Sequence, residues 1–176
     1  MSGIIKILFV LALCHCLPLS GQGLPCKNVG SEQLKVFTGT WQVAAKDRTS
    51  PGNYEENEGI STISWSIEGC SIKEVYKGTY KQHAYEVQYD TYLTDSLQIT
   101  RNFYDSEHGG LMSFSGSIEA ESINVLWLRN PDKKRMQVKN ELIWKDKDHF
   151  ESITHLSTDY GQSWQLTHHW VYTRKR

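Results

Sequence analysis

The chain has 176 residues, and its 19 Lys and Arg residues almost balance its 20 Asp and Glu residues, for a formal net charge of −1. This balance gives no general electrostatic reason to expect nucleic acid or an anionic membrane as a partner. Aromatic residues make up 11% of the chain and include six Trp, a composition that suits a β-rich fold.

Residues 1–23 have the pattern of a secretory signal peptide. One cation, Lys6, precedes the apolar run 7–13, and small residues follow near Gly21 and Gly23. The run is too short to cross a bilayer, and no later segment is long and apolar enough to do so. We therefore expect a secreted protein, extracellular or periplasmic, with no transmembrane segment. About 150 residues remain, which is one ordinary domain over 24–176.

The cysteines predict one disulfide. Cys14 and Cys16 lie in the predicted signal peptide, which leaves Cys26 and Cys70 as an even pair in an exported chain. Closing this loop is worth about 4 kcal/mol in the chain-entropy model. The alternative, two free thiols or a metal site, lacks the usual clustered Cys and His ligands, so we expect no bound metal.

After a short lead, Ser31 to Thr38 is predicted to form a short helix. Ser31 is able to cap it, Leu34 and Phe37 fall on one face, and Gly39 follows its end. The rest of the chain alternates short strand patterns with turn residues. Strands are expected near 40–46, 59–67, 70–79, 84–94, 96–105, 111–119, 123–129, 135–145, 149–157 and 163–174. The longest expected loop is Asp47 to Glu58, which is rich in Pro, Gly, Asn and Glu.

So many short antiparallel strands in one domain create exposed sheet edges. Closing the sheet removes these edges. We therefore predict an all-β fold, a single antiparallel closed barrel of about ten strands with a short N-terminal helix. A sandwich of two sheets is the main alternative.

Two motifs at opposite ends of the domain point to the same barrel. Gly39-Thr40-Trp41 opens the first strand, and Tyr172-Thr173-Arg174 closes the last one. The pair resembles the lipocalin and calycin signature, in which the Arg packs over the Trp ring and closes the base of the barrel. A guanidinium over an indole gains cation–π energy, so Trp41 and Arg174 are structural candidates.

The chain from about Leu34 to Arg174 also resembles a large, mostly bacterial family of small exported or soluble domains of unknown function, distantly related to nitrobindin-like barrels. The resemblance rests on Phe37 to Trp41, Ile67-Glu68-Gly69-Cys70, Phe103-Tyr104-Asp105, Phe114-Ser115-Gly116 and the final Tyr172-Thr173-Arg174. It implies a ten-stranded barrel and small-molecule binding, and the family carries no established activity.

The segment from Ser157 to Trp164 fits the Asp-box pattern of sialidase-type propellers. Asp159 is able to hydrogen-bond the turn backbone, Gly161 to take a positive φ, and Trp164 to pack across the hairpin. The motif occurs once in a chain too short for a propeller. We interpret it as a hairpin brace.

Histidine supplies the strongest candidate for a site in the lumen. His168 and His169 are neighbours in the last predicted strand and so point to opposite faces. If Arg174 points inward, Trp170 and His168 do too. His155 joins the His168 face unless a bulge intervenes. His168 then has three interpretations: a hydrogen-bonded core residue, a ligand contact, or a haem ligand as in nitrobindins.

Alternation places further candidate side chains in the lumen. Tyr89, Arg101, Trp127 and Arg129 fall on strand faces with apolar neighbours, so they join His168 and Trp170 as candidate ligand contacts. Buried arginines need partners. They either fix an anionic headgroup or pair with an inward Glu such as Glu74 or Glu119.

No catalytic motif emerges, because the chain has no nucleophile elbow, no phosphate loop and no tight His and Asp cluster. The favoured hypothesis is a non-enzymatic secreted barrel that binds a small hydrophobic or amphipathic molecule and needs no cofactor. The alternatives are a structural or protein-interaction module with a filled core and a haem-binding, nitrobindin-like protein.

Overall fold

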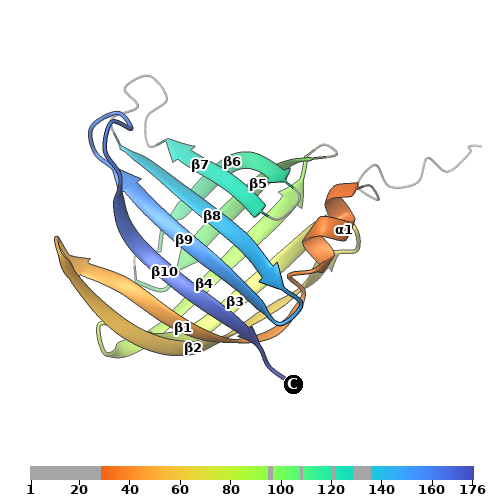
Figure 1. The fold of residues 1–176 in the computed structure, drawn as a ribbon, viewed down its shortest axis with the longest axis horizontal. Helices are drawn as coiled ribbons and strands as arrows, with labels where there is room; N and C mark the ends of the chain where they lie inside the picture. Colours follow the sequence, from red (N-terminus) through yellow and green to blue (C-terminus); the bar gives the residue numbers. More distant parts are fainter. Residues whose placement is uncertain (1–28, 95–96, 108, 120–121, 129–135) are drawn as a thin grey trace, which may run out of the picture.

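The computed structural model describes residues 29–94, 97–107, 109–119, 122–128 and 136–176, which form one closed antiparallel β-barrel with a short helix at one end (Figure 1). The helix is α1 (Val29–Lys35), and the strands are β1 (Gly39–Ser50), β2 (Asn53–Ile67), β3 (Ser71–Tyr80), β4 (His83–Leu93), β5 (Gln98–Asp105), β6 (Leu111–Glu119), β7 (Ser122–Leu128), β8 (Gln137–Asp146), β9 (His149–Ser157) and β10 (Gln165–Arg174). The predicted closed barrel is confirmed, and the two-sheet sandwich is wrong.

Pairing of β1 with β10 closes the barrel. The remaining strands pair in chain order, β2 through β10, so no described strand is an open edge. The register places Trp41 opposite Arg174 at one end of the β1–β10 ladder and Asp47 opposite His168 at the other. The continuous β1–β10 ladder therefore carries the Trp41–Arg174 pair at one end and the Asp47–His168 pair at the other.

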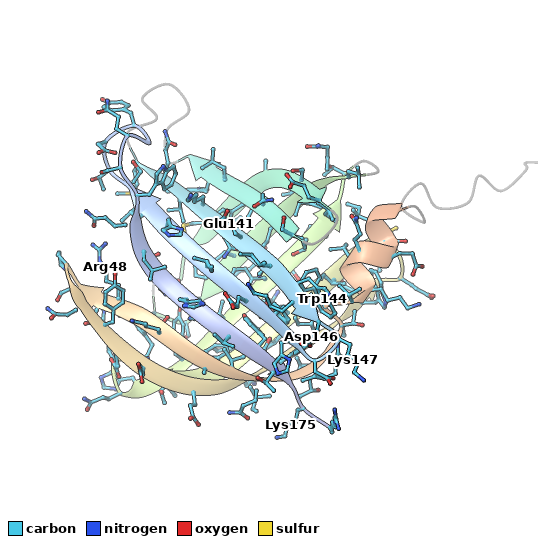
Figure 2. All side chains as sticks on the ribbon, in the orientation of Figure 1. Arg48, Glu141, Trp144, Asp146, Lys147 and Lys175 are labelled. Carbon is cyan, nitrogen blue, oxygen red and sulfur yellow. The ribbon has the colours of Figure 1, made fainter. Side chains whose placement is uncertain are left out.

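The end of the barrel beside α1 is packed with apolar side chains. Leu34 and Phe37 are buried, and the ring of Phe37 meets the edges of Phe150 and Trp144 at centroid distances of 5.1 and 5.6 Å. Trp144 lies beside α1 (Figure 2). Full burial of one such side chain stabilises a fold by about 1.5–3 kcal/mol. The short helix thus acts as a plug for this end.

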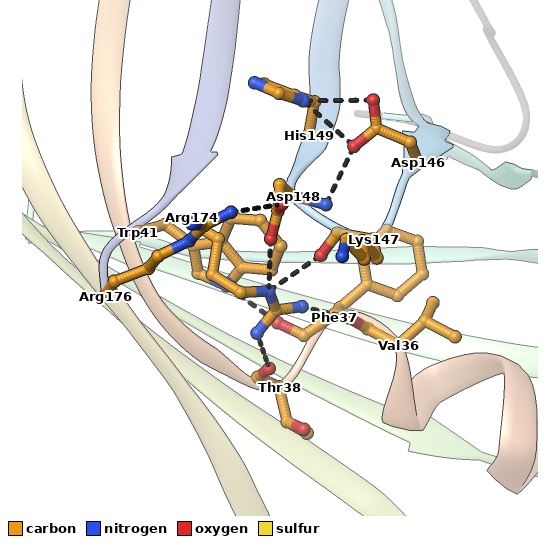
Figure 3. A network of polar contacts seen from close by, with 10 residues as sticks. All are labelled: Val36, Phe37, Thr38, Trp41, Asp146, Lys147, Asp148, His149, Arg174 and Arg176. Carbon is orange, nitrogen blue, oxygen red and sulfur yellow. Dashed lines mark hydrogen bonds and ion pairs between the residues drawn. The ribbon is translucent and has the colours of Figure 1, made fainter.

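Arg174 ties the plug to the barrel (Figure 3). Its guanidinium carbon lies 4.0 Å from the centroid of the Trp41 ring. Its nitrogens donate to the carbonyl oxygens of Val36 at 3.0 Å, Thr38 at 2.9 Å and Lys147 at 2.7 Å. One side chain therefore joins the chain after α1, the β8–β9 turn and β1.

The backbone conformation and the surroundings of Gly39 explain why the Gly-x-Trp motif begins with glycine. Its φ is +141°, and a Cβ at this position would collide with the guanidinium of Arg174. Only glycine provides both this backbone conformation and the space.

The expected long loop from Asp47 to Glu58 is wrong. β1 and β2 run through it and pair down to Ser50 and Asn53, and Gly52, with φ +81°, forms the turn. The polar composition of the segment was misleading because its inward positions also carry polar side chains. The predicted helix also begins and ends earlier than expected, at Val29 and Lys35.

The β9–β10 turn has the hydrogen bonds expected of an Asp-box. The Asp159 carboxylate accepts from the backbone N–H of Ser163 at 2.9 Å and from its hydroxyl, and Gly161, with φ +83°, donates to Ser157 Oγ at 2.8 Å. The two bonds from Ser163, with a third from the Ser157 hydroxyl, lower the pKa of Asp159 from 3.8 to about 2. The Trp164 ring packs under the Lys139 ammonium group, 4.9 Å from the centroid.

Candidate functional site

A cavity of about 150 Å³ lies in the lumen at the end of the barrel away from α1. The residues around it come from β4, β5, β6, β8, β9 and β10 and the bulge in β10. They are Tyr85, Tyr89, Phe103, Met112, Phe114, Val138, Asn140, Thr154, Leu156, Thr167, His168 and Trp170. The barrel is thus closed by packing at one end and hollow at the other.

The cavity has an apolar wall and a polar wall. β4, β5 and β6 contribute the apolar wall, which consists of Tyr85, Tyr89, Phe103, Met112 and Phe114. The polar groups are Asn140, Thr154, Thr167 and His168, from β8, β9 and β10. This separation suits a ligand with an apolar body and a polar group at one edge.

A bulge in β10 shapes the polar wall. The β9–β10 register shifts between Leu166 and His168, so His168 lies opposite Thr154, whereas His155 lies opposite Leu166. Thr154 lines the cavity, and alternation therefore turns the adjacent His155 to the outer face. The expectation that His155 joins the His168 face is wrong, because the bulge reverses the alternation.

His168 is held by a buried carboxylate. Its Nδ1 lies 2.9 Å from Oδ1 of Asp47, whose side chain is almost inaccessible at 2% exposure. Trp170 donates its indole N–H to the same oxygen at 2.7 Å, and Asn57 donates to Oδ2 at 3.3 Å. The sequence does not single out Asp47, because the polar composition of its segment predicts a loop. The alternation that continues through Ala45 and Asp47 was the available signal.

Asn140 supplies a second polar feature of this wall. Its amide nitrogen donates to Ser152 Oγ and Thr154 Oγ1, both at 3.0 Å. Its amide oxygen is buried, and within the described part of the chain it has no hydrogen-bond partner. An unsatisfied buried acceptor costs about 1–3 kcal/mol, so this oxygen favours a donor from a ligand or water.

Of the other predicted ligand contacts, Tyr89 and Trp170 border the cavity, and Arg101 and Trp127 do not. The Arg101 guanidinium is buried against Glu74, with Nη2 2.9 Å from Oε2, and lies 4.0 Å from the Tyr89 ring centroid. Trp127 packs against the apolar core. The structure therefore pairs Arg101 with Glu74, and it leaves the buried Nε of Arg101 without a hydrogen-bond partner among the described residues.

Some predicted residues lie beyond what the structure describes. Arg129, Cys26 and the signal segment 1–23 are outside the described residues. Cys70 is buried in the turn before β3. The disulfide and the role of Arg129 stay predictions.

The tyrosines of the lumen are neutral hydroxyl groups. Burial raises the pKa of Tyr76 to about 12, with help from the nearby Asp47 carboxylate. Burial likewise raises the pKa of Tyr85 and of Tyr89. These phenols remain protonated at physiological pH and offer hydrogen bonds and apolar surface, not bases or nucleophiles.

The cavity, at about 150 Å³, is smaller than the about 300–1,000 Å³ that is typical of sites for drug-sized molecules, and a haem is larger than most such molecules. Haem binding stays a prediction. Across the described ranges, no group of three or more His, Cys, Asp or Glu side chains is arranged to hold a metal ion. None of the described helices is long and apolar enough to cross a membrane.

Comparison with known proteins places the chain by fold. It matches Rv2717c from M. tuberculosis with a TM-score of 0.59 and 11% identity, over 82% of this chain and 96% of that one. It also matches the S-type phycobiliprotein lyase CPES from Guillardia theta with a TM-score of 0.55 and 10% identity, over 86% and 96% of the two chains. No protein-family model and no curated protein matches.

The structure defines the class of the protein as a ten-stranded closed β-barrel with a lumen cavity, and these similarities support the fold. At such low identity they establish the fold alone. The expected link to the nitrobindin-related family stays a prediction.

Proposed function

We propose that this protein binds a small, largely apolar molecule in the lumen of its barrel. The observation that carries the proposal is the cavity, which joins an aromatic wall to a small set of polar groups. A rigid concave site of this composition is typical of binding proteins. Its volume of about 150 Å³ equals that of an engineered apolar cavity that holds benzene, so the ligand is one ring or a short chain in size.

We further propose that the protein acts as a carrier or sensor and not as an enzyme. The support is the set of groups in the lumen: neutral phenols, an arginine already paired with Glu74, and one histidine. The signal-like segment 1–23 supports export, and Cys26 with Cys70 supports a disulfide in the exported protein.

A variant whose lumen is filled by a larger side chain tests the binding proposal. Val138 lines the cavity, and Val138→Phe adds a ring where the ligand would lie. Val171→Phe is a matched control, since Val171 is 36% exposed on the outer face of β10. In a thermal-shift screen with small aromatic and aliphatic molecules, ligands should raise the Tm of the wild type and of Val171→Phe but not of Val138→Phe.

Overpacking a core costs about 1–3 kcal/mol, so circular dichroism must show that Val138→Phe is folded. If no molecule of this size raises the Tm of the wild type, or if Val138→Phe responds like the wild type, lumen binding is wrong.

A protein-interaction role is the second candidate, and an exposed apolar pair on the outer wall favours it. Tyr104 and Leu111 are partners across β5 and β6, with 39% and 60% exposure. Large exposed apolar patches mark interaction sites. If this pair mediates self-association, light scattering should show a mass that increases with concentration for the wild type. The double variant Tyr104→Ser, Leu111→Ser should show no such increase, and its thermal shifts with ligands should be unchanged.

A further inference from the structure

Asp47 determines which nitrogen of His168 carries the proton. The three groups that contact the Asp47 carboxylate are the His168 ring, the Trp170 indole N–H and the Asn57 amide NH₂. The last two are donors only, and Thr79 donates to the Asn57 carbonyl, which fixes the amide orientation. These two fixed donors stabilise the carboxylate form of Asp47. Toward a carboxylate, His168 Nδ1 acts as the donor.

The opposite nitrogen of the ring is left for a ligand. A neutral imidazole protonated at Nδ1 carries a lone pair on Nε2. His168 lines the cavity, and within the described residues its Nε2 has no hydrogen-bond partner. The Asp47 contact also fixes the orientation of the ring, as carboxylates do for functional histidines. The polar wall therefore presents an acceptor, not a donor, at this point.

A second unpartnered group on the same wall is also an acceptor. Asn140 is buried, uses both amide protons on Ser152 and Thr154, and leaves its carbonyl oxygen without a partner in the described part of the chain. Neither His168 Nε2 nor the Asn140 carbonyl oxygen receives a hydrogen bond from a described residue, so the two acceptors favour a ligand that brings O–H or N–H groups.

The charges at the cavity argue against a permanent anion. None of the described residues around it is Lys or Arg, and Arg101 is neutralised by Glu74. A proton added to His168 would be balanced by Asp47. A buried carboxylate ligand would thus lack a net counter-charge, which makes its burial costly.

We infer that the lumen selects a small neutral aromatic molecule with an O–H or N–H group, of the phenol type, which donates to Nε2 of His168 while its ring packs on the wall formed by Phe103, Met112 and Phe114. This inference rests on the proposed lumen binding. His168 is the specificity-determining residue, and Asp47 is a positioning residue that acts through it.

The test compares phenol with toluene, which has the same shape and a methyl group in place of the hydroxyl, and with benzoate. Isothermal titration on the purified protein should show phenol binding about tenfold more tightly than toluene, as one hydrogen bond of about 1.4 kcal/mol predicts. Benzoate should bind more weakly than phenol. The comparison needs no variant and so does not depend on a variant folding.

Variants then assign the difference to His168. In His168→Phe the preference for phenol should vanish while toluene still binds. In the matched control His169→Phe, whose native side chain lies on the outer face near Glu151, the preference should remain. Equal binding of phenol and toluene, or tighter binding of benzoate, overturns the inference but leaves lumen binding intact. Failure of all three to bind overturns the inference together with the proposed function.

Discussion

The buried ion pair between Arg101 and Glu74 lies in the packed part of the lumen and gives the sharpest stability prediction. The two side chains are 2% and 4% exposed. Glu74 also accepts hydrogen bonds from Ser61 and Tyr172, each at 2.8 Å. Arg101→Met removes the cation and leaves a buried carboxylate with only neutral donors.

The expected loss for Arg101→Met is about 3–5 kcal/mol of unfolding free energy, the usual cost of breaking one side of a buried pair. The double variant Glu74→Gln, Arg101→Met removes both charges and keeps an amide oxygen for Ser61 and Tyr172. Because no uncompensated charge remains, we expect the double variant to be more stable than Arg101→Met alone.

Urea unfolding at pH 7, followed by Trp fluorescence, measures these differences. Lys77→Met is the matched control, since Lys77 pairs with Glu86 at 3.2 Å on the outer face, where the side chains are 70% and 53% exposed. Its expected change is below about 1 kcal/mol. A loss below about 1 kcal/mol for Arg101→Met, or a double variant less stable than Arg101→Met, would refute the reasoning.

Three further predictions concern Arg174 at the base of the barrel, Asp159 in the β9–β10 turn, and haem. Arg174→Lys should lower the stability measured by thermal denaturation by about 1–3 kcal/mol. An ammonium group cannot replace the planar guanidinium, which lies over the Trp41 ring and donates to three carbonyl oxygens. An unchanged Tm would contradict this. Folding lowers the pKa of Asp159 from 3.8 to about 2, so the ionised carboxylate stabilises the folded protein at pH values above the unfolded-state pKa. This stability is lost as the pH falls through about 2. Asp159→Asn should therefore flatten the acid limb of the stability curve, and a curve that keeps the wild-type slope argues against it. Hemin titration should give no Soret shift that depends on His168, and a shift lost in His168→Ala would show that haem binds.

Much of the fold follows from local patterns. Turn residues bounded most strands to within a few positions, and the paired motifs at Trp41 and Arg174 indicated which strands close the barrel. These signals succeed because alternation is imposed by the pleat and because a buried indole with a guanidinium over it has few structural explanations.

The site was harder to predict, because it depends on details that composition hides. Asp47 lies in a polar segment that resembles a loop, and its partner His168 is 121 residues away in sequence. The bulge that turns His155 outward depends on the local hydrogen-bond register of β9 and β10. The cavity is a volume left between packed side chains, and no pattern in the sequence predicts which lumen positions stay unfilled.

A crystal structure of the protein with phenol bound tests the central claim most directly. The account predicts one phenol in the lumen, with its ring against Phe103, Met112 and Phe114 and its oxygen within hydrogen-bond distance of His168 Nε2. A lumen filled by its own side chains, or phenol bound only on the outer wall, would contradict it.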